Sequence, residues 1–195
     1  MEERERNKDE LALLCQLTVP MAPSPPDLKV LFAEDAIVPN VIDEAPPQVL
    51  NLRWDGLEVK SGQLLATDTA KSAPRFTAEV NPHSLHALIM IDPDNLSRDN
   101  PCVAEWLHWL IVNIPPADVA DGINGGEHKM PYGCPCPAAR TGLHRYIVLI
   151  YEQKGRIELS KMKSRAKFSA MQFAKQHNFG TPVAGNYFLC SSAKY

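Results

Sequence analysis

Polar residues of reactive types interrupt the apolar segments of this chain at a few places. Asp92 and Asp94 directly follow an apolar run, with a single proline between them. His108 lies inside a second apolar segment, and His144 and Tyr146 lie inside a third. A carboxylate at the end of a buried strand is costly unless solvent or a partner reaches it. We therefore expect these groups to serve one another or a ligand.

An anion is the ligand that these side chains suit best. Imidazole and phenol groups can donate hydrogen bonds to an oxyanion, while Asp92 can orient a histidine or accept a cationic group. If the groups converge, Trp106 and proline loops would wall a small polar cavity, the usual make-up of a small-ligand site. A phosphate or carboxylate that bears an amine fits this chemistry. For either histidine alone, a core ring bonded to the backbone is the alternative.

Metal binding and catalysis are the competing chemistries. The histidines show no H-x-H or H-x-x-x-H spacing, and Cys134 and Cys136 are closer together than an ordinary zinc pair. Ser97 and Thr141 lack the G-x-S-x-G context of an activated nucleophile. We expect no metal, no cofactor and no enzyme activity; acid–base catalysis by the Asp and His groups is the remaining enzymatic alternative.

Composition limits the class of protein. A chain of 195 residues suits one domain with a sizeable core, and a net charge of -3 provides no basic field for nucleic acid. The odd count of 5 cysteines and a charged start without a leader predict a cytoplasmic location. No apolar span approaches about 18 residues, so no membrane helix is expected. Nothing in the sequence requires an oligomer, and we expect a monomer.

Strands dominate the predicted secondary structure. A half-exposed strand and three strands that are apolar on both faces are predicted at residues 48–54, 84–92, 105–115 and 142–153. Turns rich in Pro, Asn and Gly between them favour antiparallel pairing. Helices are predicted at 4–17 and at 169–180, the second beginning at Ser169 and ending at Gly180. We assign 1–34, with its proline-rich segment 19–27, to an appendage and 35–195 to the domain.

Alternation along the strands also predicts which side chains share a face. On this basis His108 shares its face with Trp106, Leu110 and Val112, and His144 shares its face with Tyr146, Val148 and Ile150. The basic stretch 161–167 is expected to be a solvated surface, with an anion or membrane patch as the alternative.

Two long motifs carry a resemblance to a known family. "DPDNLSRDNPCVAEWLHW" resembles the D-P-D-A-P-S-R and E-W-x-H motifs of the phosphatidylethanolamine-binding protein family, which includes the Raf kinase inhibitor proteins. "YGCPCPAARTGLHRYIVLIYEQ" resembles its G-x-P-x-P, G-x-H-R-Y and Y-E-Q run, and "TPVAGNYF" its last strand. The resemblance covers about residues 36–190. It implies a mainly β fold, in which a large central antiparallel or mixed sheet packs on a smaller one, with a few short helices near the C-terminus.

The resemblance also implies a site and a function. The anion pocket of the family would be lined here by Asp92, Trp106, His108, Pro135, Pro137, His144 and Tyr146. Asp94 would brace the loop or pair with Arg145. The implied function is non-enzymatic binding of a phosphate-bearing molecule or phospholipid head group, which modulates signalling proteins such as kinases. The alternatives are a protease-inhibitor-type interaction module and a degenerate scaffold that has lost its ligand.

Some positions depart from the family pattern. Leu96 replaces a proline, which frees a backbone angle in the rim loop. Asn95 replaces a small residue, and Phe76 stands where relatives often have tryptophan. The chain ends at Tyr195, where many relatives continue into a terminal helix that helps to close the pocket. We expect this shortened C-terminus to expose the site and weaken ligand retention.

Overall fold

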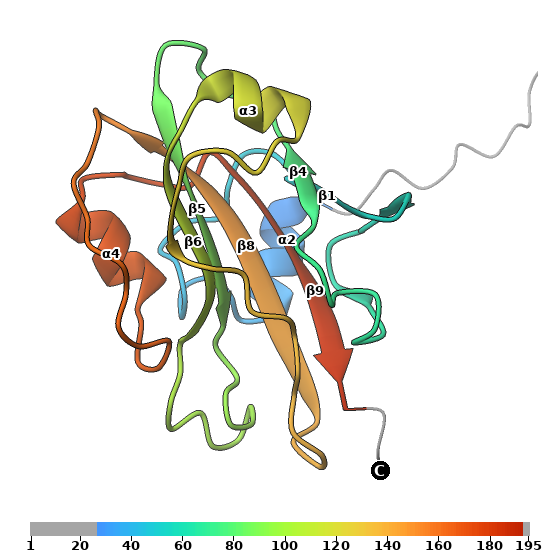
Figure 1. The fold of residues 1–195 in the computed structure, drawn as a ribbon. Coiled ribbons are helices and arrows are strands. Elements are labelled where there is room, and N and C mark those ends of the chain that lie inside the picture. Colours follow the sequence, from blue (N-terminus) through green and yellow to red (C-terminus); the bar gives the residue numbers. More distant parts are fainter. Residues whose placement is uncertain (1–26, 193–195) are drawn as a thin grey trace, which may run out of the picture.

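The computed structural model describes residues 27–192, and Figure 1 shows their arrangement. The helix predicted at 4–17 and nearly all of the proline-rich segment lie outside the described residues. The described helices are α2 (Leu28–Glu34), α3 (Pro116–Asp121) and α4 (Ala170–Gln176). The strands are β1 (Asn51–Trp54), β2 (Leu57–Glu58), β3 (Gln63–Leu64), β4 (Arg75–Thr77), β5 (Leu85–Asp92), β6 (Trp106–Ile114), β7 (Glu127–Met130), β8 (Leu143–Gln153) and β9 (Ala184–Ser191).

These strands form one large and one small sheet. The large sheet has six strands in the order β3-β9-β8-β5-β6-β7, and the small sheet has three in the order β2-β1-β4. Neighbouring strands are antiparallel except for β3 and β9, which run parallel. The predicted fold class is confirmed. Of the described helices, however, only α4 lies near the carboxyl end.

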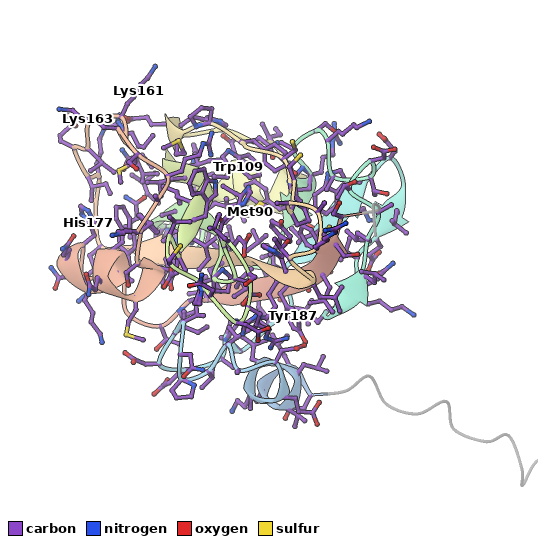
Figure 2. All side chains as sticks on the ribbon, turned by 90° about the horizontal axis from the view of Figure 1, so that it is seen from below. Met90, Trp109, Lys161, Lys163, His177 and Tyr187 are labelled. Atoms are coloured by element: carbon purple, nitrogen blue, oxygen red, sulfur yellow. The ribbon has the colours of Figure 1, made fainter. Side chains whose placement is uncertain are left out.

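Both faces of the large sheet are covered, as its strands of apolar residues require. One face packs against α2 and α4 through side chains that include Phe32 and Phe173. The other face packs against the small sheet through Leu52 and Phe76. Figure 2 shows the fully buried Trp109 of this second core near the middle of the molecule, while Lys161 of the basic stretch projects at its periphery.

A β-bulge at His108 corrects the predicted face of β6. Met90 of β5 pairs with Trp109, and the next residue, Ile91, pairs with Leu107, so that His108 is the extra residue. Beyond the bulge, the alternation is reversed. Leu110 and Val112 consequently pack in the core on the helix side, whereas the prediction placed them on the face of His108.

The faces predicted for β8 and the pattern predicted for β1 are both present. Tyr146, Val148 and Ile150 pack together in the core beneath the small sheet. Along β1, exposed and buried side chains alternate from Asn51 to Trp54. Strict alternation therefore predicts orientation where no extra residue interrupts the ladder.

Helix α2 shows that the folded unit begins before residue 35. Asp27 caps this helix by accepting a hydrogen bond from the amide of Lys29 at 3.0 Å. Leu28 is buried, and the ring of Phe32 packs edge-on against Tyr187. Residues 28–34 were predicted to be part of the appendage, and they pack against the large sheet through Leu28 and Phe32.

Helix α4 begins as predicted and ends earlier. The Ser169 side chain accepts the amide hydrogen of Gln172, as expected of an N-cap. The helix ends at Gln176, and Asn178 takes the left-handed conformation with φ of 55°, which leaves Gly180 outside the helix end.

Candidate functional site

The sequence-predicted polar residues meet at one end of the large sheet. Strand β5 ends there at Asp92, and its antiparallel neighbours β6 and β8 begin there. Figure 1 shows the connecting loops, 93–105 and 131–142, extending beyond the sheet at this end. Antiparallel pairing thus brings together residues that are far apart in the chain.

Asp92, His144 and Thr141 form a buried hydrogen-bonded chain. His144 Nδ1 lies 2.8 Å from Asp92 Oδ2, and His144 Nε2 lies 2.9 Å from Thr141 Oγ1. Asp92 Oδ1 also accepts the amide hydrogen of Asp94 at 2.7 Å. Asp92 and His144 are each only 1 % exposed. Both ring nitrogens of His144 are therefore occupied within the protein.

The hydroxyl of Thr141 connects His144 to the backbone of the loop before β8. Thr141 donates its hydroxyl hydrogen to the carbonyl of Ala138 at 2.7 Å, so that its oxygen accepts from His144 Nε2. His144 Nδ1 faces the Asp92 carboxylate, which also accepts. His144 is therefore held at both ring nitrogens, between the Asp92 carboxylate and the Thr141 hydroxyl.

His108 provides the polar atom that lacks a partner. The carbonyl of Gly133 accepts a hydrogen bond from Nδ1 at 2.7 Å, and the backbone of Gly133 donates to the His108 carbonyl at 2.8 Å. His108 Nε2 is buried and has no hydrogen-bond partner. Burial lowers the pKa of His108, and the Gly133 and Asp92 interactions only partly offset it. The ring is therefore neutral at pH 7, with its proton on Nδ1 and a lone pair on Nε2.

Tyr146 lies between the two histidines. Its ring centroid lies 5.1 Å from that of His108, edge-on, and 6.4 Å from that of His144, stacked. Burial and the nearby Asp92 raise the pKa of Tyr146. The phenol consequently keeps its hydrogen at neutral pH and can donate to an oxyanion.

Asp94 pairs with Arg145, as the resemblance implies. The carboxylate accepts from Arg145 Nη2 at 2.6 Å, from Nε at 2.9 Å and from the Arg145 backbone amide at 2.8 Å. Arg145 also donates to the carbonyl of Asp35, just after α2. This buried, bidentate pair fixes the start of β8 against the loop after β5.

The rim residues differ in how far they are buried. Pro135 is buried, whereas Trp106 and Pro137 are half-buried. His108 is 5 % and Tyr146 1 % exposed, so both side chains are almost completely buried. The predicted ligand-accessible hollow, and the ligand contacts of all these residues, stay predictions.

The resemblance implied that the 133–137 loop forms the rim of the site, but sequence reasoning missed the contacts of three residues with the histidines. Gly133 contacts His108, and Thr141 contacts His144. The only sequence signal for either residue was its position in the loop close to the predicted site residues. Arg165 lies in the basic stretch predicted to be a solvated surface, yet its guanidinium donates to the carbonyls of Leu107 and His108. That stretch therefore contributes a structural cation that stabilises the His108 backbone.

Within residues 27–192, no group of three or more His, Cys, Asp or Glu side chains is arranged to hold a metal ion. No helix within the same residues is both long and apolar enough to cross a membrane.

Comparison with known proteins gives a family match. Residues 55–188 match the family model described as phosphatidylethanolamine-binding protein. "Putative odorant-binding protein A5" of Drosophila melanogaster is 31 % identical over 83 % of this chain and 79 % of its own length. The 26 kDa secreted antigen of Toxocara canis is 33 % identical over 80 % of this chain, which spans only 62 % of that protein.

Solved structures share the fold. The solution structure of CG7054 is 36 % identical, has a TM-score of 0.65, and covers 82 % of this chain and 91 % of its own. Carboxypeptidase Y inhibitor, solved with its cognate proteinase, is 21 % identical with a TM-score of 0.72, over 90 % of this chain and 98 % of its own. At that identity, the second likeness concerns the fold alone.

Proposed function

Because the chain belongs to the phosphatidylethanolamine-binding protein family, we propose that it binds phosphate-bearing or carboxylate-bearing groups at the sheet end that carries His108. The proposed activity is binding, with no chemical step. The observation that carries it is His108 Nε2, a buried polar atom without a partner beside the Tyr146 phenol. Such an atom is costly unless a ligand or water satisfies it.

The proton on His108 determines how an anion would bind. Because Nδ1 donates to Gly133, neutral His108 offers only a lone pair at Nε2. A monoprotonated phosphate group can donate its own hydrogen to that lone pair. Alternatively, His108 takes up a proton and donates to the dianion. In both cases the complex holds one proton more than the free protein and the phosphate dianion do.

The remaining residues would have separate roles. Tyr146 would donate its hydroxyl to a ligand oxygen, and Trp106 would form an apolar wall. Asp92 and His144 would act by position, because their hydrogen bonds to each other and to Thr141 already occupy them. Arg145 would not contact the ligand, since Asp94 offsets its charge.

Phosphate binding tests this proposal directly. Titration calorimetry with inorganic phosphate and with phosphorylethanolamine compares the wild type with His108→Ala, His144→Ala and His86→Ala. His86 is a matched control, because it is a buried histidine of the same sheet with neither ring nitrogen bonded. We expect at least a tenfold loss of affinity, about 1.4 kcal/mol, in the two site variants and none in the control.

Equal affinities in all four proteins would contradict the proposal. Absence of binding in the wild type would instead favour the degenerate scaffold. A difference between the two ligands would show whether the ethanolamine amine contributes to recognition.

A protein partner remains an alternative use of the same fold. Modulation of a kinase and inhibition of a protease both belong to this alternative, and carboxypeptidase Y inhibitor shares the fold. Protease inhibition that survives His108→Ala would place the partner surface outside the site. The monomeric state and the absence of nucleic-acid binding also stay predictions. So does the cytoplasmic location, since one relative is named a secreted antigen.

A further inference from the structure

Two cysteines face each other in the loop that joins β7 to β8. The sulfur atoms of Cys134 and Cys136 lie 3.4 Å apart, within hydrogen-bond contact. Cys136 is exposed to solvent and Cys134 is half-buried, while Pro135 between them is buried. A proline fixes its own φ angle, and its burial holds the turn that keeps both sulfur atoms on one side.

We propose that Cys134 and Cys136 are a redox-active dithiol that low-molecular-weight disulfides of the glutathione type oxidise to a disulfide, and that this oxidation weakens anion binding at His108. The first half stands on the loop geometry alone. The second half rests on the proposed function.

The reaction proceeds by two thiol–disulfide exchanges. The exposed Cys136 loses its proton to water and attacks the small disulfide, whose S–S bond breaks to release one thiolate. A mixed disulfide on Cys136 results. The Cys134 thiolate then attacks Cys136 Sγ and displaces the second thiolate. Overall, the two cysteines lose two electrons and two protons, and the small disulfide is reduced to two thiols.

The surroundings of the dithiol set its reactivity. The hydrogen bond with Cys134 is the largest cause that raises the pKa of Cys136, and the ammonium of Lys71 partly opposes it. Because the thiolate is the nucleophile, oxidation should accelerate as pH rises above neutral. Exposed or strained disulfides are the readily reduced ones, so the bond should be reversible.

The position of the dithiol connects it to the site. On one side, the Gly133 carbonyl accepts from His108 Nδ1 and the Gly133 amide donates to the His108 carbonyl. On the other side, Thr141 accepts from His144. Closing the disulfide brings the sulfur atoms from 3.4 Å to about 2.05 Å. This contraction displaces Cys134, which directly follows Gly133. Because a binding site tolerates displacements of only about 0.5 Å, the shift should disturb the contacts of Gly133 with His108.

Two other cysteines serve as internal controls. Cys190 is buried, and burial raises its pKa to about 12, which keeps it an unreactive thiol. Cys102 is exposed, and among residues 27–192 it has no cysteine contact comparable to that of Cys134. It should form mixed disulfides without a resolving partner.

The first experiment follows the thiols. The full chain and its Cys134→Ser, Cys136→Ser and Cys102→Ser variants are equilibrated in glutathione buffers, alkylated and analysed by peptide mass spectrometry. We expect wild type and Cys102→Ser to form a disulfide between Cys134 and Cys136, which dithiothreitol reverses. The other two variants should form only mixed disulfides. Free thiols at both positions in an oxidising buffer would overturn the proposal.

The second experiment measures phosphate affinity in the two redox states. We expect about tenfold weaker binding by the oxidised wild type, and no redox dependence in Cys136→Ser. A disulfide that forms without changing the affinity overturns the coupling. If the reduced protein binds no phosphate, the proposed function fails, and the thiol experiment still decides the redox chemistry.

Discussion

The two ends of strand β5 each bury a polar group and treat it differently. At the start of the strand, His86 is fully buried and neither ring nitrogen has a hydrogen-bond partner. At the other end, Asp92 uses both carboxylate oxygens, one on His144 and one on the Asp94 amide. At this end His108 Nε2 is the buried polar atom without a partner, whereas the charges of Asp94 and Arg145 are paired.

The difference shows what distinguishes a candidate ligand site from a core histidine. A buried histidine nitrogen without a hydrogen-bond partner occurs at both ends of the strand. Only the Asp92 end adds the buried Asp94–Arg145 ion pair and a neutral phenol in contact with the unpaired histidine. Neighbours that are already oriented make an unpaired atom useful for recognition, whereas His86 is only a cost to stability.

The largest expected effect comes from breaking the buried ion pair at the Asp92 end. Asp94→Asn leaves the Arg145 guanidinium buried without its countercharge, which should lower the free energy of unfolding by about 3 kcal/mol. Urea unfolding measures this change. Glu152→Gln is the matched control at the His86 end, where the carboxylate accepts from Asn81 and Ser84 near the surface. It should cost less than about 1 kcal/mol, and equal costs would remove the contrast.

Replacing His86 should stabilise the protein. Burial lowers the pKa of His86, so the unfolded state binds the proton more readily. Stability is then complete above the unfolded pKa of about 6.5 and falls as pH decreases below it. His86→Phe removes two unsatisfied nitrogens and should raise the free energy of unfolding by about 1 kcal/mol at pH 7. The variant should also lose less stability than the wild type when the pH is lowered. Urea unfolding at neutral and mildly acidic pH tests both expectations. A variant less stable than the wild type would contradict the conclusion that buried His86 lowers stability.

Acid should strengthen phosphate binding through His108. Its pKa is lowered in the free protein, and a bound anion must raise it. Affinity for phosphate dianion should therefore increase about fivefold, roughly 1 kcal/mol, as pH falls from neutral toward the lowered pKa. Calorimetry in buffers of different ionisation enthalpy should detect the proton taken up. His108→Gln should abolish this dependence and His86→Phe should keep it; the reverse pattern would exclude His108.

The smallest expected effect concerns the orientation of His144. Thr141→Val removes the acceptor of His144 Nε2 while keeping the side-chain shape. Phosphate affinity should fall about twofold, roughly 0.4 kcal/mol. Thr141→Ser retains the hydroxyl and should bind like the wild type. Equal affinity in all three proteins would show that this hydrogen bond does not orient the site.

Local patterns predicted β1, β5, β6, β8 and the start of α4, but not α2, α3 or the short strands β2, β3, β4 and β7. Apolar runs bounded by turn residues gave the positions of β5, β6 and β8 to within about one or two residues. The prediction was wrong for the face of Leu110, because the bulge at His108 has no signature in the alternation. The packing of Leu28 and Phe32 of α2 on the large sheet was not predicted either, because the neighbouring proline-rich segment obscured the apolar face of this helix.

The sequence by itself determined the positions of the long strands and the kinds of polar group that end them, since periodicity is a property of short segments, and its family motifs implied the fold class. Tertiary structure decided which of these groups have partners. Asp92 and His144 are separated by 52 residues yet lie 2.8 Å apart, and the loop that supplies Gly133 and Thr141 holds both histidines. Hydrogen bonds depend on distance and direction in space, and only the antiparallel register and the bulge at His108 set these.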